Sequence, residues 1–232
     1  MTESKDSQRR LLLAGAVSLA AFILTTVLVF SGAIQGADNS LALAIDQGYL
    51  GSALNQLMVD ATNYGREYFW IGVVAVMLLL GKGPTKRLAL ELAVLFMVGI
   101  VAGDVLKPVL FRERPFEALA GIVQRVATDT DSSFPSGHAL IVSIGGGFAI
   151  SKFKKKSVAI LLAFEAAVVC YSRVYVGAHY PTDVLGGVFL GFSIALLGTF
   201  VLEKYLRTAL DRASRFVGRV LRWGYFDSSS GE

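Results

Sequence analysis

Long apolar runs separated by short polar segments dominate this chain. The run over residues 11–30 contains no charged residue, and its length is enough to cross a hydrocarbon core about 30 Å thick. The run is too long for the apolar part of a signal peptide, so it predicts a retained helix. Further apolar runs predict helices over residues 68–81, 88–106, 139–151, 158–172 and 184–202. The pattern therefore predicts an all-α membrane protein with six transmembrane helices.

The composition supports this prediction and excludes other classes. The chain has 232 residues, of which 54% are hydrophobic and 17% are charged, and its mean hydropathy is +0.58. Soluble domains are about 25% charged, and disordered chains combine low hydrophobicity with high charge. The single cysteine, Cys170, excludes a disulfide framework. We expect one membrane-embedded domain over residues 1–232.

The basic residues predict the orientation. The net charge of +4 is also compatible with nucleic-acid binding, but the charges cluster at the ends of apolar runs, so no nucleic-acid partner is predicted. With six helices and a cytoplasmic N-terminus, 16 of the 22 basic residues fall on the cytoplasmic side, as the positive-inside rule requires. Both termini are then cytoplasmic, including a basic tail over residues 204–232. The basic residues predicted outside are Arg66, Lys107, Arg112, Arg114, Arg125 and Arg173.

Two further segments have the pattern of helices that lie along a membrane surface. Residues 39–58 combine apolar positions with few charges. Residues 204–223 alternate arginines with apolar side chains, a pattern typical of an amphipathic helix on anionic lipid. A solvated, partly frayed tail is the alternative for the second segment, and residues 227–232 are expected to be disordered.

The predicted outer loops contain both histidines of the chain, His138 and His179, together with the cations Lys107, Arg114 and Arg173. They lie at the outer ends of four predicted helices, so the fold can bring all five to one depth. Fixed positive charges and free backbone N–H groups suit a phosphate dianion. These groups therefore predict an anion site.

The segment around residues 135–138 adds backbone donors to this site. Ser136 is placed to cap the helix that follows it, and Gly137 allows a ligand to approach the backbone closely. Pro181 is expected to open the last apolar helix at its first turn.

The spacing of His179 and Asp183 suggests a nucleophile. Residues four apart at a helix start share a face, and an aspartate bound to one ring nitrogen leaves the other free to attack phosphorus. His138 would then protonate the leaving oxygen. No metal is required, although a zinc site with His138 as third ligand is an alternative. Arg112 and Arg125 are predicted to be rim charges, either of which could meet a second phosphate.

Three motifs in this order resemble the signatures of the type 2 phosphatidic acid phosphatase superfamily. Lys107 is followed after six residues by Arg114-Pro115, and the second motif is Pro-Ser-Gly-His at residues 135–138. The third is Ser-Arg at 172–173, five residues, His179, three residues and Asp183. The motifs cover residues 107–183 and match the family pattern without departure. The resemblance implies the helical core shared by acid phosphatases and vanadium haloperoxidases, with interfacial helices around it.

The resemblance also implies roles for these residues. It implies a phosphohistidine on His179, orientation by Asp183, and His138 as general acid and then base. It implies metal-independent catalysis without a cofactor on the extracytoplasmic side, with a lipid phosphate as substrate and membrane lipids as surroundings. No obligate protein partner is inferred. The phosphate-binding residues that it implies are Lys107, Arg114, Ser136, Gly137 and Arg173.

The substrate and the class of function keep alternatives. An isoprenoid diphosphate is favoured because the chain is compact and has no additional headgroup-recognition domain. Phosphatidylglycerophosphate and phosphatidate are the alternative lipids. A lipid-phosphate-binding transporter is the alternative of another class, although binding alone needs no nucleophile such as His179. A soluble, halide-oxidising branch of the superfamily exists, and the hydropathy of this chain argues against that activity.

Overall fold

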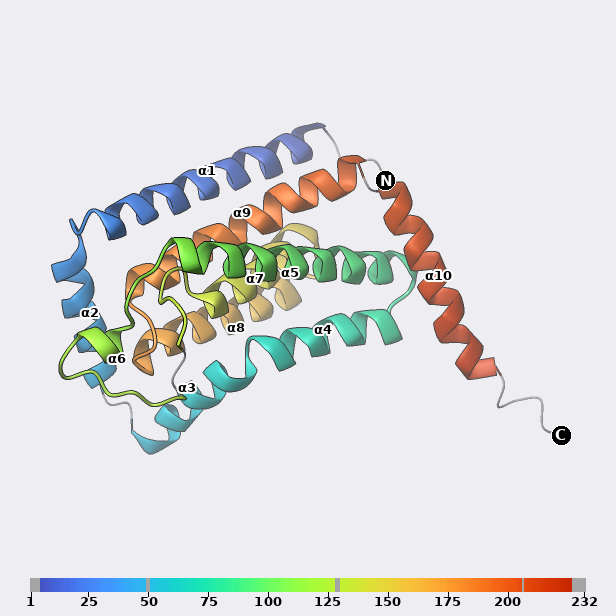
Figure 1. Ribbon diagram of the computed structural model, residues 1–232. Coiled ribbons are helices and arrows are strands. Elements are labelled where there is room, and N and C mark those ends of the chain that lie inside the picture. Colours follow the sequence, from blue (N-terminus) through green and yellow to red (C-terminus); the bar gives the residue numbers. More distant parts are fainter. Residues whose placement is uncertain (1–4, 49–50, 128–129, 206, 227–232) are drawn as a thin grey trace.

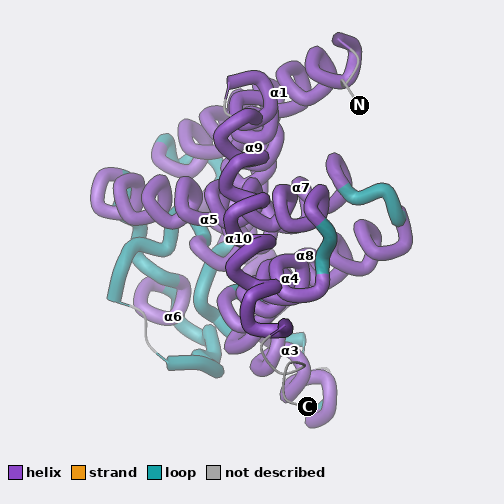
Figure 2. Tube along the Cα trace, turned by 90° about the vertical axis from the view of Figure 1, so that its right-hand side faces the viewer, coloured by secondary structure: helices purple, strands orange, loops and turns teal. Residues whose placement is uncertain are grey.

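A computed structural model describes residues 5–48, 51–127, 130–205 and 207–226. In these ranges the chain forms helices and no strand (Figure 2), so the all-α prediction is confirmed. Every predicted apolar run lies in a helix, except that the helix of the run over residues 68–81 ends at Leu80, one residue before the end of that run. These helices are α1 (Lys5–Phe30), α4 (Glu67–Leu80), α5 (Gly83–Val109), α7 (Gly137–Lys152), α8 (Lys156–Tyr175) and α9 (Pro181–Tyr205).

Four helices of the described chain, α1, α5, α8 and α9, are long and apolar enough to cross a membrane. The apolar helix α4 has 14 residues and α7 has 16, so both fall short of the length of about 20 residues that a straight span needs. The count of six spans therefore stays a prediction. Large apolar side chains on the outward faces remain exposed, among them Val17, Ile71, Val101 and Phe164, as a lipid-facing surface requires.

Glycines let α7 and α9 approach closely. α9 packs against α1 and α7, and α7 also packs against α8 and α5. A Cβ atom at Gly187 would lie 2.5 Å from the carbonyl oxygen of Ser136, and one at Gly191 would lie 2.5 Å from that of Leu140. Small residues at such contacts allow the backbones of membrane helices to meet. The close contact holds the start of α7, with His138, beside the start of α9.

The two ends of the helix bundle differ in what they carry (Figure 1). One end holds α2 (Gln35–Gln47), α3 (Ser52–Tyr64) and the short α6 (Pro115–Ala118). The C-terminal ends of α5 and α8 and the N-terminal ends of α7 and α9 lie at this same end, where the predicted site residues are. The opposite end holds the start of α1, the turn between α4 and α5, and α10. The fold thus separates the predicted outer and inner segments.

The segment over residues 39–58 is not one continuous element. α2 ends at Gln47 and α3 begins at Ser52, and Gly51 between them has a φ of +84°, a conformation that residues other than glycine rarely adopt. α2 packs against α8 and α9, whereas α3 packs against α8 and α4. The placement of both helices along a membrane surface stays a prediction.

The predicted C-terminal amphipathic helix is present as α10 (Arg207–Phe226), which crosses the end of the bundle (Figure 2). α10 packs mainly against α5 and also against α9. Leu210 is buried in the main core, and Asp211 lies 3.6 Å from the guanidinium of Arg87 in α5. A helix over these residues is confirmed, its contact with lipid stays a prediction, and residues 227–232 lie outside the described chain.

Candidate active site

The hydrogen bond of His179 to the backbone fixes which ring nitrogen carries its proton. His179 lies in the turn between α8 and α9 and is 1% exposed. Its Nδ1 lies 2.8 Å from the carbonyl oxygen of Ser133, and a carbonyl oxygen can only accept. Nδ1 therefore carries the proton in the neutral ring and Nε2 keeps its lone pair. Nε2 lies 3.4 Å from Nη1 of Arg114, so the lone pair is on the side of the motif cations.

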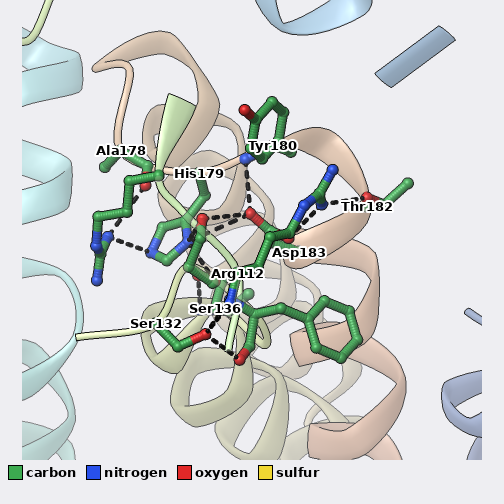
Figure 3. A network of polar contacts seen from close by, with 12 residues as sticks. Arg112, Ser132, Ser136, Ala178, His179, Tyr180, Thr182 and Asp183 are labelled. Carbon is green, nitrogen blue, oxygen red and sulfur yellow. Dashed lines mark hydrogen bonds and ion pairs between the residues drawn. The ribbon is translucent and has the colours of Figure 1, made fainter. Parts of the chain in front are cut away.

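Asp183 acts on His179 indirectly (Figure 3). Its Oδ2 lies 3.8 Å from Nδ1 of His179, which is too far for a hydrogen bond. Oδ2 instead accepts from the Ser133 hydroxyl at 2.5 Å and from the Tyr180 N–H at 2.9 Å. The spacing of four does bring the two side chains to ion-pair distance, but the predicted direct hydrogen bond is not formed, because the proton on Nδ1 is directed to the Ser133 carbonyl oxygen. Asp183 accepts a hydrogen bond from the Ser133 hydroxyl, and the Ser133 carbonyl oxygen accepts one from the His179 ring.

Arg112 is a largely enclosed partner of Asp183, with 9% of its side chain exposed, so its predicted place on the rim is wrong. Its guanidinium donates to Asp183 Oδ1 at 2.6 Å and to Asp38 Oδ2 of α2 at 2.7 Å. It also donates to Thr182 Oγ1 at 3.0 Å and lies 3.9 Å from the centre of the Tyr180 ring. Burial opposes the charge, yet Asp183 and Asp38 raise the pKa of Arg112 above its usual value. Arg112 therefore stays charged and neutralises two buried carboxylates.

Arg125, the second predicted rim charge, is also held in a structural ion pair. It pairs with the buried carboxylate of Asp46 in α2, donates to the Tyr175 carbonyl oxygen at 2.7 Å and stacks 4.7 Å from the Tyr175 ring centre. Both arginines that were candidates for binding a second phosphate are therefore ion-paired with buried aspartates.

Thr62 of α3 joins His138 to Arg173. Nε2 of His138 lies 3.1 Å from the Thr62 carbonyl oxygen, and Nη1 of Arg173 donates to the Thr62 hydroxyl at 2.9 Å. The carbonyl contact places a proton on Nε2 of His138, so Nδ1 keeps the lone pair of the neutral ring. The Arg173 carbonyl oxygen in turn accepts from the His179 N–H at 3.2 Å. Arg173 thus connects the two histidines of the site.

The start of α7 has the predicted cap. The Ser136 hydroxyl accepts from the Ala139 N–H at 3.4 Å, and the Ser136 N–H donates to the Asp183 carbonyl oxygen at 3.0 Å. The position of a Cβ on Gly137 would be 4.0 Å from Nζ of Lys107 and 3.6 Å from Nη1 of Arg66. Two cations therefore flank the helix N-terminus, where backbone N–H groups bind anions.

Asp131 bridges two of the predicted phosphate ligands. Its carboxylate pairs with Nζ of Lys107 and with the Arg114 guanidinium, and Arg114 also donates to the Ala178 carbonyl oxygen at 3.0 Å. Burial opposes ionisation of Asp131, but hydrogen bonds from Lys107 and Arg114 hold its pKa below the usual range. An anionic group therefore occupies the place between Lys107 and Arg114, while half of the Asp131 side chain stays exposed.

The surroundings of His179 keep its ring neutral. Burial, followed by the charges of Arg173, Arg114 and Lys107, lowers the pKa of His179 well below 6.5. A neutral ring with its lone pair on Nε2 is a nucleophile at neutral pH.

His138 and Arg173 line a cavity of about 190 Å³. Arg66, Glu67, Thr62 and Asn63 from the α3–α4 region also line it, together with Val126 and Ala127. Within the described residues, no group of three or more His, Cys, Asp or Glu side chains is arranged to hold a metal ion.

Several residues of this site escape sequence reasoning. Ser133 lies two residues before the second motif, but its contact with Asp183 spans 50 residues. Asp38 and Thr62 lie in amphipathic helices without a motif, and Arg112 contacts Asp38 across 74 residues. Contacts over such separations leave no local pattern, so only the positions of the motif residues themselves could be predicted.

This chain is similar in sequence and in fold to several known proteins. The chain is 42% identical over 146 residues to the undecaprenyl-diphosphatase of Sulfolobus acidocaldarius, covering 63% of this chain and 69% of the relative. It is 29% identical over 200 residues to phosphatidylglycerophosphatase B of Bacillus subtilis, covering 79% and 90%. The crystal structure of a transmembrane PAP2-type phosphatidylglycerolphosphate phosphatase from Bacillus subtilis matches with a TM-score of 0.68 and 26% identity, covering 82% and 96%.

The family of this chain is shown by a family model that matches the half of the chain containing the three motifs. The model of the PAP2 superfamily matches residues 88–206, which contain the three motifs, the site built on α5, α7, α8 and α9, and most of the helix bundle. With its apolar helices and its transmembrane neighbours of known structure, the chain is a multi-pass membrane protein that belongs to the PAP2 superfamily.

Proposed function

We propose that this protein is an integral membrane lipid phosphatase that removes the terminal phosphate of a lipid phosphate or diphosphate through a phosphohistidine on His179. One observation carries the proposal. The Ser133 carbonyl oxygen holds the proton of His179 on Nδ1, which leaves the Nε2 lone pair beside Arg114. A site that only bound phosphate would need no unprotonated ring nitrogen directed toward its cations.

The proposed reaction has two steps. In the first, Nε2 of His179 attacks phosphorus and the bond from phosphorus to the leaving oxygen breaks. Burial and the charges of Arg173 and Arg66 lower the pKa of His138, so we propose that the bound phosphate dianion raises this pKa again, and that His138, then protonated on both ring nitrogens, gives its Nδ1 proton to the leaving oxygen. In the second, water attacks the phosphohistidine, and His138 takes the proton of the water. The phosphorus–nitrogen bond then breaks and its electron pair returns to Nε2. The products are inorganic phosphate and the lipid alcohol, or the lipid monophosphate when the substrate is a diphosphate.

The phosphate oxygens would be held by the cations and by the start of α7. We assign this binding to Lys107, Arg114 and Arg173, with Ser136 and Gly137 contributing the helix N-terminus. The substrate phosphate would replace the Asp131 carboxylate between Lys107 and Arg114. Preorganised donors of this kind stabilise charge in the transition state without reorganisation. Asp183 acts as a positioning residue through Ser133.

For the substrate we favour an isoprenoid diphosphate. The relative at 42% identity is named an undecaprenyl-diphosphatase. Phosphatidylglycerophosphate and phosphatidate are the alternatives, since a relative at 29% identity is named a phosphatidylglycerophosphatase. We propose that the reaction needs no metal or cofactor.

We further propose that residues 1–232 form one catalytic domain with its site on the extracytoplasmic side. The distribution of basic residues supports this topology, because 16 of 22 fall on the side opposite the motifs in a six-span arrangement. Both termini, including the basic tail over residues 204–232, would then be cytoplasmic.

Phosphate release tests the proposal. Purified protein in detergent with EDTA should release inorganic phosphate from an isoprenyl diphosphate, and millimolar vanadate should inhibit the release. His179→Ala should abolish it, whereas Arg212→Ala in exposed α10 should not. Full activity of His179→Ala would refute the nucleophile. Proteoliposomes that move a lipid phosphate across the bilayer without releasing phosphate would instead indicate a transporter.

A further inference from the structure

Arg66 lies outside the three motifs and adds a cation to the candidate active site. It lies directly before α4, and its guanidinium lines the same 190 Å³ cavity as His138 and Arg173. A Cβ on Gly137 would be 3.6 Å from its Nη1, so the guanidinium reaches the start of α7. About a third of the Arg66 side chain is exposed, and its ion partner is the neighbouring, more exposed Glu67.

The other non-motif arginines near the site are committed to buried carboxylates. Arg112 bridges Asp38 and Asp183, and Arg125 pairs with Asp46. Withdrawing either arginine would leave a buried charge uncompensated, which costs several kcal/mol. The pair of Arg66 with Glu67 is exposed to solvent, and ion pairs of this kind contribute little to stability. Arg66 can therefore exchange Glu67 for a ligand at little cost.

The direction of the reaction places the leaving group beside Arg66. The nucleophile and the leaving oxygen lie on opposite sides of the phosphorus in an in-line displacement. His179 is the proposed nucleophile, and His138, which lines the cavity with Arg66, is the proposed donor to the leaving oxygen. When the substrate is a diphosphate, that oxygen belongs to the internal phosphate. The internal phosphate must then enter the cavity that Arg66 lines.

The cavity suits a headgroup rather than a lipid tail. Its volume of about 190 Å³ is below the range of about 300–1,000 Å³ that is typical of pockets for drug-sized ligands. Its lining combines two arginines, a histidine, Thr62 and Asn63 with the carboxylate of Glu67 and two apolar side chains. A phosphate that binds Arg66 would therefore take the place of its ion partner Glu67. Arginine is the cation best suited to binding phosphate oxygens in pairs.

We propose that Arg66 is the ligand of the internal phosphate of a lipid diphosphate, and that it gives this site its preference for diphosphates over monophosphates. This inference rests on the proposed phosphatase function and on the role assigned to His138. The motif cations bind the scissile phosphate of either substrate, whereas Arg66 meets only the second phosphate and its additional negative charge.

A matched pair of substrates tests the assignment. Phosphate release from farnesyl diphosphate and farnesyl monophosphate is measured with purified wild type, Arg66→Gln and Arg66→Lys in detergent. Arg66→Gln should lower kcat/KM for the diphosphate about tenfold relative to the monophosphate, which is about 1.4 kcal/mol. The loss should appear mainly as a raised KM. Arg66→Lys should keep part of the preference, because it keeps the charge but not the paired donors.

Arg212→Gln provides the matched control, because it makes the same substitution on an exposed part of α10 at the opposite end of the bundle. It should leave the ratio of the two substrates unchanged. Thermal unfolding of each variant shows whether it remains folded at the assay temperature. An equal loss for both substrates, or no loss, would overturn the role of Arg66 and leave the phosphatase proposal standing. A wild-type protein that releases no phosphate from any lipid would instead defeat the proposed function itself.

Discussion

Replacement of Arg112 by methionine is the sharpest test of how the site is held together. Methionine keeps much of the length of the side chain but removes its charge and all of its donors. The change leaves the carboxylates of Asp38 and Asp183 without their shared cation, and these side chains are 1% and 0% exposed. It also removes the cation that lies over the Tyr180 ring.

The magnitude follows from the burial of the two carboxylates. Removing one partner of a buried ion pair costs about 3–5 kcal/mol, because the other charge stays buried without compensation. The total stability of a protein is typically about 5–15 kcal/mol, so the loss is a large fraction of it. In a chain of this size, 1 kcal/mol corresponds to about 2–4 °C in Tm. Arg112→Met should therefore lower Tm by roughly 6–20 °C.

The assay is thermal unfolding of the purified protein in a mild detergent, with Arg215→Met on exposed α10 as the matched control. The control should change the free energy of unfolding by no more than about 0.5 kcal/mol. The double variant Arg112→Met, Asp38→Asn should recover part of the loss, because it removes one of the two uncompensated charges. A destabilisation by Arg112→Met below about 1 kcal/mol would show that the network does not hold the site.

Four further results are expected. Asp131→Asn should lower KM up to about fivefold, because an exposed ion pair that competes with the substrate phosphate contributes at most about 1 kcal/mol; a raised KM would contradict this competition. The pKa of His179 is well below 6.5, so NMR should find its ring neutral at pH 6, and a protonated ring there would refute the assignment. The unfolded chain takes up this proton near pH 6.5, so the stabilisation from a neutral His179 is complete above that pH and declines as the pH falls below it. His138→Ala should slow phosphate release by about 10²–10⁴-fold, and an unchanged rate would exclude it as the proton donor. Gly187→Ala should destabilise by about 1–3 kcal/mol, because its Cβ would meet the Ser136 carbonyl oxygen at 2.5 Å, whereas Gly72→Ala, which meets nothing within 4 Å, should be close to neutral in a thermal unfolding assay.

The helix pattern was predictable because lipid imposes a simple rule on sequence. A span must be largely apolar along its length, so each of α1, α5, α8 and α9 appears as a long apolar run. The runs of α1 and α9 carry no charge, whereas that of α5 contains Glu91 and Asp104 and that of α8 contains Glu165. The cap at Ser136 and the start of α9 at Pro181 were also predictable, since both depend on residues adjacent in sequence. The break between α2 and α3 had a local signal in Gly51, whose φ is positive.

The connections within the site were not predictable in the same way. The spacing of His179 and Asp183 suggested a direct hydrogen bond, but the proton on Nδ1 is directed to the Ser133 carbonyl oxygen instead. Arg112 looked like a rim charge because its partner Asp38 lies 74 residues away. Sequence reasoning identifies residue types that suit the chemistry, whereas the partners that orient them depend on tertiary packing.

α2 and α3 lie outside the motif region, and each of them supports one half of the site. Asp38 of α2 accepts from Arg112 and from the Thr182 N–H at 3.1 Å, so α2 supports the half that contains Asp183. Thr62 of α3 holds the other half, which contains His138 and Arg173. If the motif residues bind the scissile phosphate as proposed, changes in α2 should act on the nucleophile side of the reaction. Changes in α3 and at Arg66 should act on the leaving-group side, where one lipid phosphate differs from another.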